Sequence, residues 1–481
     1  MPPRTPKPLR IAVLADSDTR WKWGALTAGR IAPGGRTAAA GPSDPSALPM
    51  EAGHRDAAQV TPVLDGYLLR GRSTPTARQL AEVGVHADSM REVTAVEFLD
   101  VMARETYDIL VLALVGGGVQ AVLHGLRRVW NGTGRRPVVV TGYVGVVYEK
   151  LADGLLLRHG ADLVLANSRQ DAERFRAVYE GVGADPSAVT EVALPFLGGA
   201  PHTGAHDPYT VVFAAQPSVP ESRRDRAYLL DRLILHARLH PDREVLLKLR
   251  SKPGEHTTHI EELPYQKLAQ RLDPPPNFRL VYGNMGEVLD RTDLMVTISS
   301  TAALESLHRR VPTVVLTDLG IRESLGNHHF IGSGCLASWD QLDAGHLPAP
   351  DEEWVSRQGV APAAPATDIA TGSGTGTDPG AAVGSYATAF DAARERVAKL
   401  LAHPGGLPEP APYYTLATAP GYLPGILARH HLGPDGTPLP GAPAAGREPG
   451  PVRQIVRRAA RGAYRHGVQR VAPVIRRMGE L

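Results

Sequence analysis

Two successive series of alternating strand-like and helical segments constrain the fold of this chain more than any other feature. Short apolar runs end in loop residues and are separated by amphipathic stretches, which is typical of a parallel sheet with crossover helices. The first series contains the predicted strands Leu9–Ala15, Val63–Leu69, Asp108–Val115, Val138–Thr141 and Asp162–Ala166. The second contains Tyr209–Ala215, Glu244–Leu249, Phe278–Tyr282, Leu294–Ile298 and Thr313–Thr317. The sequence therefore predicts an α/β protein with two doubly wound, Rossmann-like domains whose strand ends face a shared cleft.

The composition indicates which parts of the chain are domains and which are linkers or tails. Gly and Pro are abundant, with 50 and 42 among 481 residues, so some stretches must be linkers or tails. We predict an N-terminal domain over 1–200, with a mobile insert at about 31–60, and a C-terminal domain over 207–345. After them we predict, in order, a flexible excursion over 348–384, a returning helix over 385–402, a Pro/Gly-rich linker over 403–450 and a basic amphipathic tail over 451–481.

Cysteine content and hydropathy bear on the location of the protein. The single cysteine, Cys335, excludes an internal disulfide and a multi-cysteine metal site. No apolar run reaches the roughly 18 to 20 residues that cross a bilayer, and the N-terminus lacks the pattern of a secretory signal. We therefore expect a cytoplasmic protein.

The tail carries most of the basic charge. Residues 447–481 hold nine Arg and two Glu, or +7, so the rest of the chain is at −5 for a total of +2. Apolar residues of 452–471 gather on one helical face and arginines on the remainder, which fits anionic lipid headgroups. Docking onto the acidic body of the protein and binding to nucleic acid are the alternatives. We rank an anionic membrane surface first, at the inner face of the membrane, and expect no nucleic acid.

Hydroxyl and cationic residues follow strands of the second series. Ser299, Ser300 and Thr301 form a turn between a strand and a helix, where hydroxyls and backbone N–H groups make a phosphate site. The alternative is a simple helix cap, with Glu305 paired to an arginine one turn later. Lys248 and Arg250 occupy alternate positions at another strand end and would neutralise a phosphate. The alternative there is an edge strand protected by charge.

The segment Ile298–Val315 resembles the nucleotide-sugar half of GT-B glycosyltransferases, notably lipid A disaccharide synthase and the capsule, polysialic acid and glycerophosphate-polymer transferases. The resemblance implies that the turn Ser299–Thr301 faces the donor phosphate and that Glu305 faces the ribose. The opening segment Leu9–Gly24 resembles an uncharacterised glycosyltransferase family of high-GC bacteria, which brings no established substrate. The chain departs from the capsule-type enzymes in one respect, because Lys252-Pro253 stands where several of them carry a His-Pro pair.

The loop after the strand Thr313–Thr317 lies where GT-B proteins usually contact the donor sugar. Arg322, Asn327 and His328 are our candidates for that contact. His328 and its neighbour His329 lack a spaced carboxylate or cysteine partner, so we predict no metal site.

The first domain offers candidates for the acceptor side. Asp16 and Asp18 follow the first strand, and we predict Asp18 as the base that takes a proton from an acceptor hydroxyl; an Asx turn or N-cap is the alternative. Gly117 and Gly118 belong to a Gly-x-Gly-x-x-Ala motif, which we interpret as a loop that lets an acceptor approach rather than as a dinucleotide site. Tyr143 follows a later strand and is placed beside the acceptor.

These observations predict a metal-independent glycosyltransferase without a cofactor. It would move a sugar from a nucleotide-sugar donor, held by the second domain, to a hydroxyl acceptor on the first, in the synthesis of cell-surface polysaccharide or glycoconjugate. A nucleotide-sugar epimerase of the same fold and a non-catalytic nucleotide-binding scaffold remain as alternatives.

Overall fold

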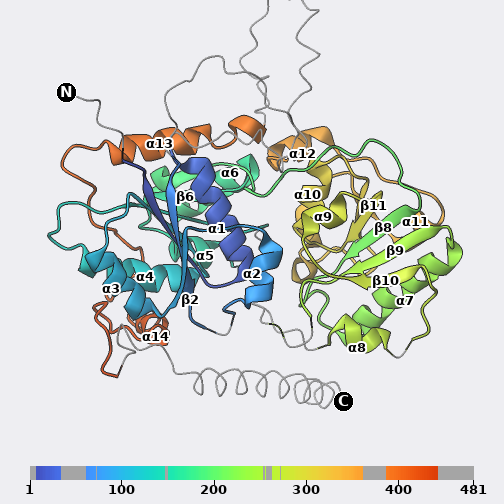
Figure 1. Cartoon of the computed structure of the whole chain (residues 1–481), viewed down its shortest axis with the longest axis horizontal. Helices are drawn as coiled ribbons and strands as arrows, with labels where there is room; N and C mark the ends of the chain where they lie inside the picture. The colour runs from blue at the N-terminus through green and yellow to red at the C-terminus, as the bar shows by residue number, and fades with distance from the viewer. Residues whose placement is uncertain are drawn as a thin grey trace, which may run out of the picture.

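Two parallel sheets organise the protein, as Figure 1 shows. The computed structural model describes residues 7–33, 61–71, 73–146, 150–252, 255, 263–270, 272–360 and 386–441. The first sheet has the order β3-β2-β1-β4-β5-β6-β7 and the second β10-β9-β8-β11-β12-β13, and all neighbouring strands are parallel. The chain thus has the two Rossmann-like domains of the predicted GT-B-like fold.

The elements of the first domain alternate in the expected way. Its strands are β1 (Arg10–Ala15), β2 (Val63–Leu69), β3 (Ser89–Val93), β4 (Ile109–Ala113), β5 (Val138–Gly142), β6 (Leu163–Ala166) and β7 (Val189–Glu191). Its helices are α1 (Asp18–Ile31), α2 (Ala77–Val83), α3 (Ala95–Arg104), α4 (Gly116–Val129), α5 (Leu151–Leu156) and α6 (Arg169–Gly181). Strands β1, β4, β5 and β6 are almost fully buried and apolar, as a parallel sheet covered on both faces requires.

The second domain repeats the pattern with shorter helices. Its strands are β8 (Tyr209–Ala214), β9 (Arg243–Lys248), β10 (Phe278–Val281), β11 (Leu294–Thr297), β12 (Thr313–Leu316) and β13 (Leu336–Ala337). Its helices are α7 (Arg223–Leu239), α8 (Tyr265–Ala269), α9 (Met285–Leu289), α10 (Ala302–His308), α11 (Trp339–Asp343) and α12 (Glu352–Arg357). Helices α7, α8 and α11 pack on one face of the sheet, and α9 and α10 on the other.

The end of the described chain returns to the first domain, where Figure 1 shows α13 (Asp391–Leu401) and α14 (Leu423–Arg429) lying against it. Helix α13 contacts α1, β5 and β7, whereas α14 contacts α4. Buried side chains from both helices, including Phe390, Val397, Leu423 and Leu427, join the two cores of the first domain. The first domain is therefore built from two separate parts of the sequence.

Two predicted segments need correction. The excursion predicted over 348–384 contains α12, because Trp354, Val355 and Val360 are buried against the first domain. The predicted linker 403–450 contains α14, because Leu423 and Leu427 bury their side chains on α4. The insert at 34–60, the segments 361–385 and 442–450, and the tail 451–481 lie outside the described residues. No helix in the described ranges is long and apolar enough to cross a bilayer.

Four aspartates fix strand register in the same way. Each aspartate stands immediately before a strand and forms two hydrogen bonds to one residue of the neighbouring strand. Its backbone N–H donates to the carbonyl oxygen of that residue, and its carboxylate accepts the backbone N–H of that residue. The pairs are Asp88 with Leu64, Asp108 with Arg10, Asp162 with Val139 and Asp293 with Thr210. The two bonds satisfy a donor and an acceptor that would otherwise end the ladder unpaired.

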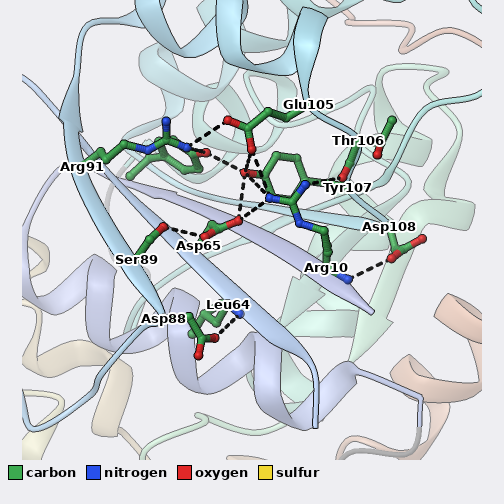
Figure 2. A network of polar contacts seen from close by, with 11 residues as sticks. Arg10, Leu64, Asp65, Asp88, Ser89, Arg91, Glu105, Thr106, Tyr107 and Asp108 are labelled. Carbon is green, nitrogen blue, oxygen red and sulfur yellow. Dashed lines mark hydrogen bonds and ion pairs between the residues drawn. The ribbon is translucent and has the colours of Figure 1, made fainter. Parts of the chain in front are cut away.

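A polar network lies at the amino-terminal ends of the strands of the first sheet (Figure 2). Asp65 Oδ2 accepts from Arg10 at 2.8 Å and from the Tyr107 hydroxyl at 3.1 Å. Arg10 and Arg91 both pair with Glu105, at 3.1 and 3.2 Å. Two carboxylates and two guanidinium groups thus balance in charge, as partly buried ions require.

Candidate active site

A cleft of about 660 Å³ lies between the carboxyl ends of the two sheets. The first domain supplies polar residues from the turn after β1, from α2 and from the loop after β5: Ser17, Asp18, Lys22, Glu82 and Gly145. The second domain supplies residues from the turns after β8, β9 and β11 and from α10: Gln216, Lys248, Arg250, Ser300, Thr301 and Glu305. The cleft therefore lies at the strand ends, as predicted, and six of the predicted site residues line it.

The hydroxyl turn after β11 divides into a structural part and an open part. Ser299 is buried, and its Oγ lies 2.5 Å from the Leu325 carbonyl oxygen, so it does not line the cleft. Ser300 Oγ lines the cleft and accepts the Ala302 N–H at 3.3 Å, which makes it a local cap as well. The Thr301 hydroxyl lines the cleft and has no hydrogen-bond partner among the described residues.

Two cations lie at the end of β9. Lys248 is largely buried and donates from Nζ to the Leu249 carbonyl oxygen at 2.9 Å. Burial lowers the pKa of the Lys248 ammonium to about 8, although the carboxylates of Glu82 and Glu305 oppose that shift. Arg250 is more accessible and reaches across the cleft to the first domain. This strand end is a cationic wall of the cleft rather than an exposed sheet edge.

Glu305 brings a carboxyl group to the same wall. The residue is 8% exposed and lines the cleft, and no hydrogen bond reaches its carboxylate from the described residues. Burial raises the pKa of the Glu305 carboxyl, and the charges of Lys22, Arg309 and Lys248 reduce that rise without cancelling it. The alternative in which Glu305 pairs with an arginine one turn later is wrong, because that residue, Arg309, turns away to Asp290 and to the backbone of Gly198 and Gly286. Glu305 thus faces the cleft with its hydrogen-bonding capacity unused.

Asp16 and Asp18 have different surroundings, although only one residue separates them. Asp18 lines the cleft and accepts from Arg250 Nη2 at 2.9 Å. Asp16 accepts from Arg20 at 2.9 Å and from the Val115 N–H at 3.0 Å, so it joins the turn after β1 to the start of α4. Asp16 is not among the residues that line the cleft, and its geometry is that of a structural residue.

The loop after β12 lines the cleft through residues other than those predicted. Asn327 is fully buried, donates to the carbonyl oxygens of Leu316 and Gly320, and accepts the Arg322 N–H. The Arg322 side chain is exposed, and neither it nor His328 lines the cleft. The side chains of these three residues therefore do not lie where the predicted sugar contacts require them, because none of them lines the cleft. Glu323, Ser324, Leu325 and Gly326 of the same loop line the cleft instead.

The predicted acceptor-side residues are covered. Ile426 of α14 lies over Gly117, and Leu114 and His430 lie over Gly118, so the glycine turn is closed by the returning chain. Tyr143 points inward, with the Arg158 guanidinium 3.9 Å from its ring centroid. None of these three residues lines the cleft, which is bordered at this point by Val144 and Gly145. Trp21 and Trp23 of α1 are buried in the core.

The polar groups of the cleft that the sequence reasoning missed include Lys22, Glu82, Gln216 and Asn284. Gln216 and Asn284 follow β8 and β10, so the strand-end rule already pointed to their positions. Lys22 lies one helical turn beyond Asp18, and its spacing from that residue was the available signal. No pattern indicated Glu82, because only the packing of α2 against the cleft brings it there.

The two domains also touch directly at one backbone position. A β-carbon built on Gly145, in the loop after β5, would lie 2.6 Å from the Thr301 Oγ1 of the second domain. Apolar side chains of α10, including Leu304 and Leu307, belong to the same core as residues of the first domain. The hydroxyl turn and the first domain are therefore in direct contact at the border of the cleft.

Comparison with solved structures identifies proteins of similar architecture. One is the putative UDP-N-acetylglucosamine 2-epimerase from Listeria monocytogenes, with 12% identity, coverage of 71% of this chain and 87% of that one, and a TM-score of 0.45. The glycotransferase of kitacinnamycin has 14% identity, coverage of 82% and 96%, and a TM-score of 0.39. The lipopolysaccharide outer core galactosyltransferase WaaB has 9% identity, coverage of 70% and 88%, and a TM-score of 0.36.

Comparison of the sequence with curated proteins and with family models adds to these structural similarities. No curated protein matches the chain in sequence. A family model described as "Putative glycosyltransferase (DUF6716)" matches residues 11–372, which span both sheets and every residue of the cleft. Because this match covers well over half of the 481 residues, the chain belongs to that glycosyltransferase family.

Proposed function

We propose that the protein is an active, metal-independent enzyme that transfers a sugar from a nucleotide-sugar to a hydroxyl acceptor in the cleft. The observation that carries this proposal is Glu305, an almost buried carboxyl group that opens into the cleft without a hydrogen-bond partner among the described residues. Because its carboxyl group opens into the cleft, it is free to accept hydrogen bonds from a ligand bound there. An ionised carboxylate only accepts hydrogen bonds, and the hydroxyls of a ribose can donate them.

The neighbours of Glu305 suit the remainder of such a donor. Lys248 and Arg250 offer positive charge to a diphosphate, and the Thr301 and Ser300 hydroxyls add hydrogen bonds from the turn after β11. Charge placed where the leaving phosphate develops negative charge stabilises the transition state of transfer. These groups would therefore hold the donor in the ground state and assist its departure.

Asp18 is the proposed base on the acceptor side. As the acceptor oxygen attacks the anomeric carbon, its proton would pass to the Asp18 carboxylate and the bond to the nucleotide phosphate would break. In the structure Asp18 is held by Arg250. A donor phosphate would compete for that guanidinium, so donor binding would release the base when it is needed.

The acceptor and its location extend the proposal. The cleft is wide enough for a donor together with part of an acceptor, because small-molecule sites span about 300 to 1,000 Å³. We assign the acceptor to cell-surface polysaccharide or glycoconjugate synthesis at the inner face of the membrane. The basic segment 452–471 lies outside the described residues, so its binding to anionic lipid stays a prediction.

A thermal-shift screen of the full chain against UDP, GDP, CMP, CDP and dTDP, without metal and then with Mg²⁺, tests the donor site. A ligand that binds the native state raises its stability by mass action. We expect one nucleotide to stabilise the protein without metal, Glu305→Gln and Ser300→Ala to abolish the effect, and Glu287→Gln, an exposed carboxylate outside the cleft, to leave it unchanged. No shift with any nucleotide, or equal shifts in all variants, would overturn the assignment of the site.

Turnover is measured separately with the nucleotide-sugar of the nucleotide that binds. Transfer to an added acceptor supports the proposal. Conversion of the donor to another nucleotide-sugar without acceptor would identify an epimerase instead, and binding without any turnover would identify a scaffold.

A further inference from the structure

Two histidines and an aspartate meet at the base of the second sheet, away from the cleft. His202 and His206 lie in the segment that joins the two domains, with His-x-x-x-His spacing, and Asp293 is the residue before β11. His202 Nε2 and His206 Nδ1 lie 3.0 and 2.7 Å from the same atom, Asp293 Oδ1. The three ligand-type atoms are all within 4.8 Å of one another.

Asp293 differs from the other three aspartates that fix strand register. Asp162 faces the guanidinium of Arg136 with both oxygens, and Asp88 and Asp108 stand beside the ends of β2 and β1 without a histidine partner in the described chain. The Asp293 side chain is fully buried, and two imidazoles take the place of an arginine. Register alone therefore does not account for this pair of histidines.

We infer that His202, His206 and Asp293 bind a divalent transition-metal cation of the zinc class. Two imidazoles and one carboxylate form a donor set that suits zinc and disfavours calcium or magnesium, which take oxygen ligands. This inference goes beyond the sugar-transfer site, because the metal lies outside the cleft and takes no part in the proposed reaction. It departs from the sequence-based prediction that the chain has no metal site, which weighed the adjacent histidines His328 and His329 but not this cluster.

The distances are close to those of a bound site. With metal–ligand bonds of about 2.0 Å, adjacent ligands of a tetrahedral site lie about 3.3 Å apart. The two observed nitrogen–oxygen separations of 3.0 and 2.7 Å therefore need to widen by about 0.3 and 0.6 Å, and the two ring nitrogens already lie within 4.8 Å of each other. A cation would take the place of the protons that now lie between the ring nitrogens and the carboxylate.

The surroundings favour a cation as well. The Thr210 N–H donates to Asp293 Oδ2 at 2.7 Å, which orients the carboxylate in the way that outer-shell partners orient metal ligands. The exposed fraction rises from 0% for the Asp293 side chain to 15% for His202 and 40% for His206, so the site has a path to solvent. No arginine or lysine pairs with Asp293 in the described part of the chain.

A second histidine group in the same domain serves as a comparison. His236 Nδ1 lies 2.7 Å from Asp343 Oδ1, and the His240 ring lies 4.5 Å from the His236 ring, centroid to centroid, at a tilt of 49°. Arg232 pairs with the same carboxylate at 2.9 Å, and Arg243 lies 3.5 Å from His236 Nε2. Two guanidinium groups already supply positive charge here, so a metal cation would be repelled. This group provides a matched control.

The metal would fix the connection between the domains. The His202 N–H donates to the Arg309 carbonyl oxygen at 2.6 Å, and the Arg309 guanidinium donates to the Gly198 carbonyl oxygen at 2.6 Å. A cation held by His202, His206 and Asp293 would add a third attachment of the same segment to the second domain. We therefore expect bound metal to stabilise the protein against unfolding.

Titration of untagged, chelator-treated full chain with Co²⁺ and Zn²⁺ tests the inference. We expect one equivalent of Co²⁺ to give a visible ligand-field spectrum, one equivalent of Zn²⁺ to displace it, and both metals to raise the melting temperature. His206→Ala, at the most exposed ligand, is expected to weaken the affinity by about tenfold or more. His240→Ala is expected to leave it unchanged.

Three outcomes would overturn the inference: no stoichiometric uptake, uptake that is equal in His206→Ala and the unaltered protein, or uptake that His240→Ala abolishes. If His206→Ala is unstable even without metal, His202→Gln replaces it in the same comparison. Far-ultraviolet circular dichroism of the metal-free variants separates loss of a ligand from loss of the fold.

Discussion

The guanidinium of Arg250 lies 2.9 Å from the carboxylate of Asp18, and the two residues belong to different domains. Arg250 follows β9 of the second sheet, whereas Asp18 begins α1 of the first. The ion pair therefore bridges the cleft that both residues line. Any anion that binds at the end of β9 has to compete with Asp18 for this cation.

The bridge predicts different effects for its two partners. Asp18→Asn removes the proposed base, and we expect turnover to fall by about a hundredfold, since general-base catalysis contributes about 10²–10⁴. Nucleotide affinity is expected to rise, because the phosphate no longer competes with a carboxylate for Arg250. Arg250→Gln removes a phosphate ligand, and we expect nucleotide affinity to fall about tenfold. Steady-state kinetics and calorimetric binding measure the two effects. Equal losses of affinity in both variants would argue against separate roles.

We expect Glu305 to lower the stability of the folded protein while it supports nucleotide binding. Burial raises the pKa of its carboxyl, so the folded state holds the proton more tightly than the unfolded state, and stability falls as pH rises above the ordinary value of about 4.3. Glu305→Gln removes this pH-dependent penalty and is expected to raise the free energy of unfolding at pH 7.5 by about 1 kcal/mol, with a smaller gain at pH 5. Urea unfolding at both pH values measures the difference. The same variant is expected to lose nucleotide binding, so a gain in both properties would contradict the assignment.

Lys248 predicts how nucleotide binding depends on pH. Because burial lowers the pKa of its ammonium to about 8, the charge is present at pH 7 and is lost above pH 8. We expect affinity for the stabilising nucleotide to fall by up to about tenfold per pH unit between pH 8 and pH 10. Lys248→Arg keeps its charge over this range and is expected to flatten the profile. Calorimetric titrations across the range measure both; identical profiles would exclude Lys248 as a phosphate ligand.

The network in Figure 2 predicts acid sensitivity of the first domain. Burial opposes ionisation of Asp65 and Glu105, but their hydrogen bonds from Ser89, Arg10, Tyr107 and Arg91 outweigh it and lower the pKa of both carboxyls. Their contribution to stability is therefore present at neutral pH and is lost as pH falls below about 4.

Asp65→Asn tests this dependence. We expect the variant to lose about 2 kcal/mol of unfolding free energy at pH 7, because Arg10 and Tyr107 lose a charged acceptor. The difference from the unaltered protein should shrink as the pH approaches 3. Glu92→Gln, at an exposed carboxylate that pairs with Arg70, is the control, and a comparable loss there would show that general charge balance is responsible.

Gly145 predicts a coupling between the domains. A methyl group at this position would displace the Thr301 hydroxyl that lies 2.6 Å away. We expect Gly145→Ala to weaken nucleotide binding about tenfold, and to have little further effect in a Thr301→Ala background, where the methyl group meets only the β-carbon at 3.6 Å. A double-mutant cycle of binding free energies measures the coupling; additive effects would exclude it.

Buried, regular elements of the fold could be predicted from the sequence, and marginal ones could not. The bounds of β2 agree with the predicted range, Val63–Leu69. Strand β3 was missed because its central residues, Met90 to Glu92, are exposed and carry no period. Helix α12 was missed because its few apolar residues stand in an Ala- and Pro-rich stretch and are buried only by distant parts of the chain.

The candidate site shows the same division. Asp18, Lys248, Arg250 and Ser300 were found because each follows a strand, and the strand direction fixes the edge at which such residues meet. The inward turn of Asn327 and the covering of Gly117 by Ile426 depend on side-chain packing between segments far apart in sequence. Local pattern carries no information about such contacts.

The return of α13 and α14 to the first domain has a consequence for biosynthesis. A ribosome releases the second domain's entire sheet before it has made Phe390 or Leu423, which complete the hydrophobic cores of the first domain. The later-made domain can therefore finish folding on the nascent chain, while the earlier-made domain keeps apolar surface uncovered until α13 and α14 have been made. Chaperone demand during synthesis should accordingly fall on the amino-terminal half.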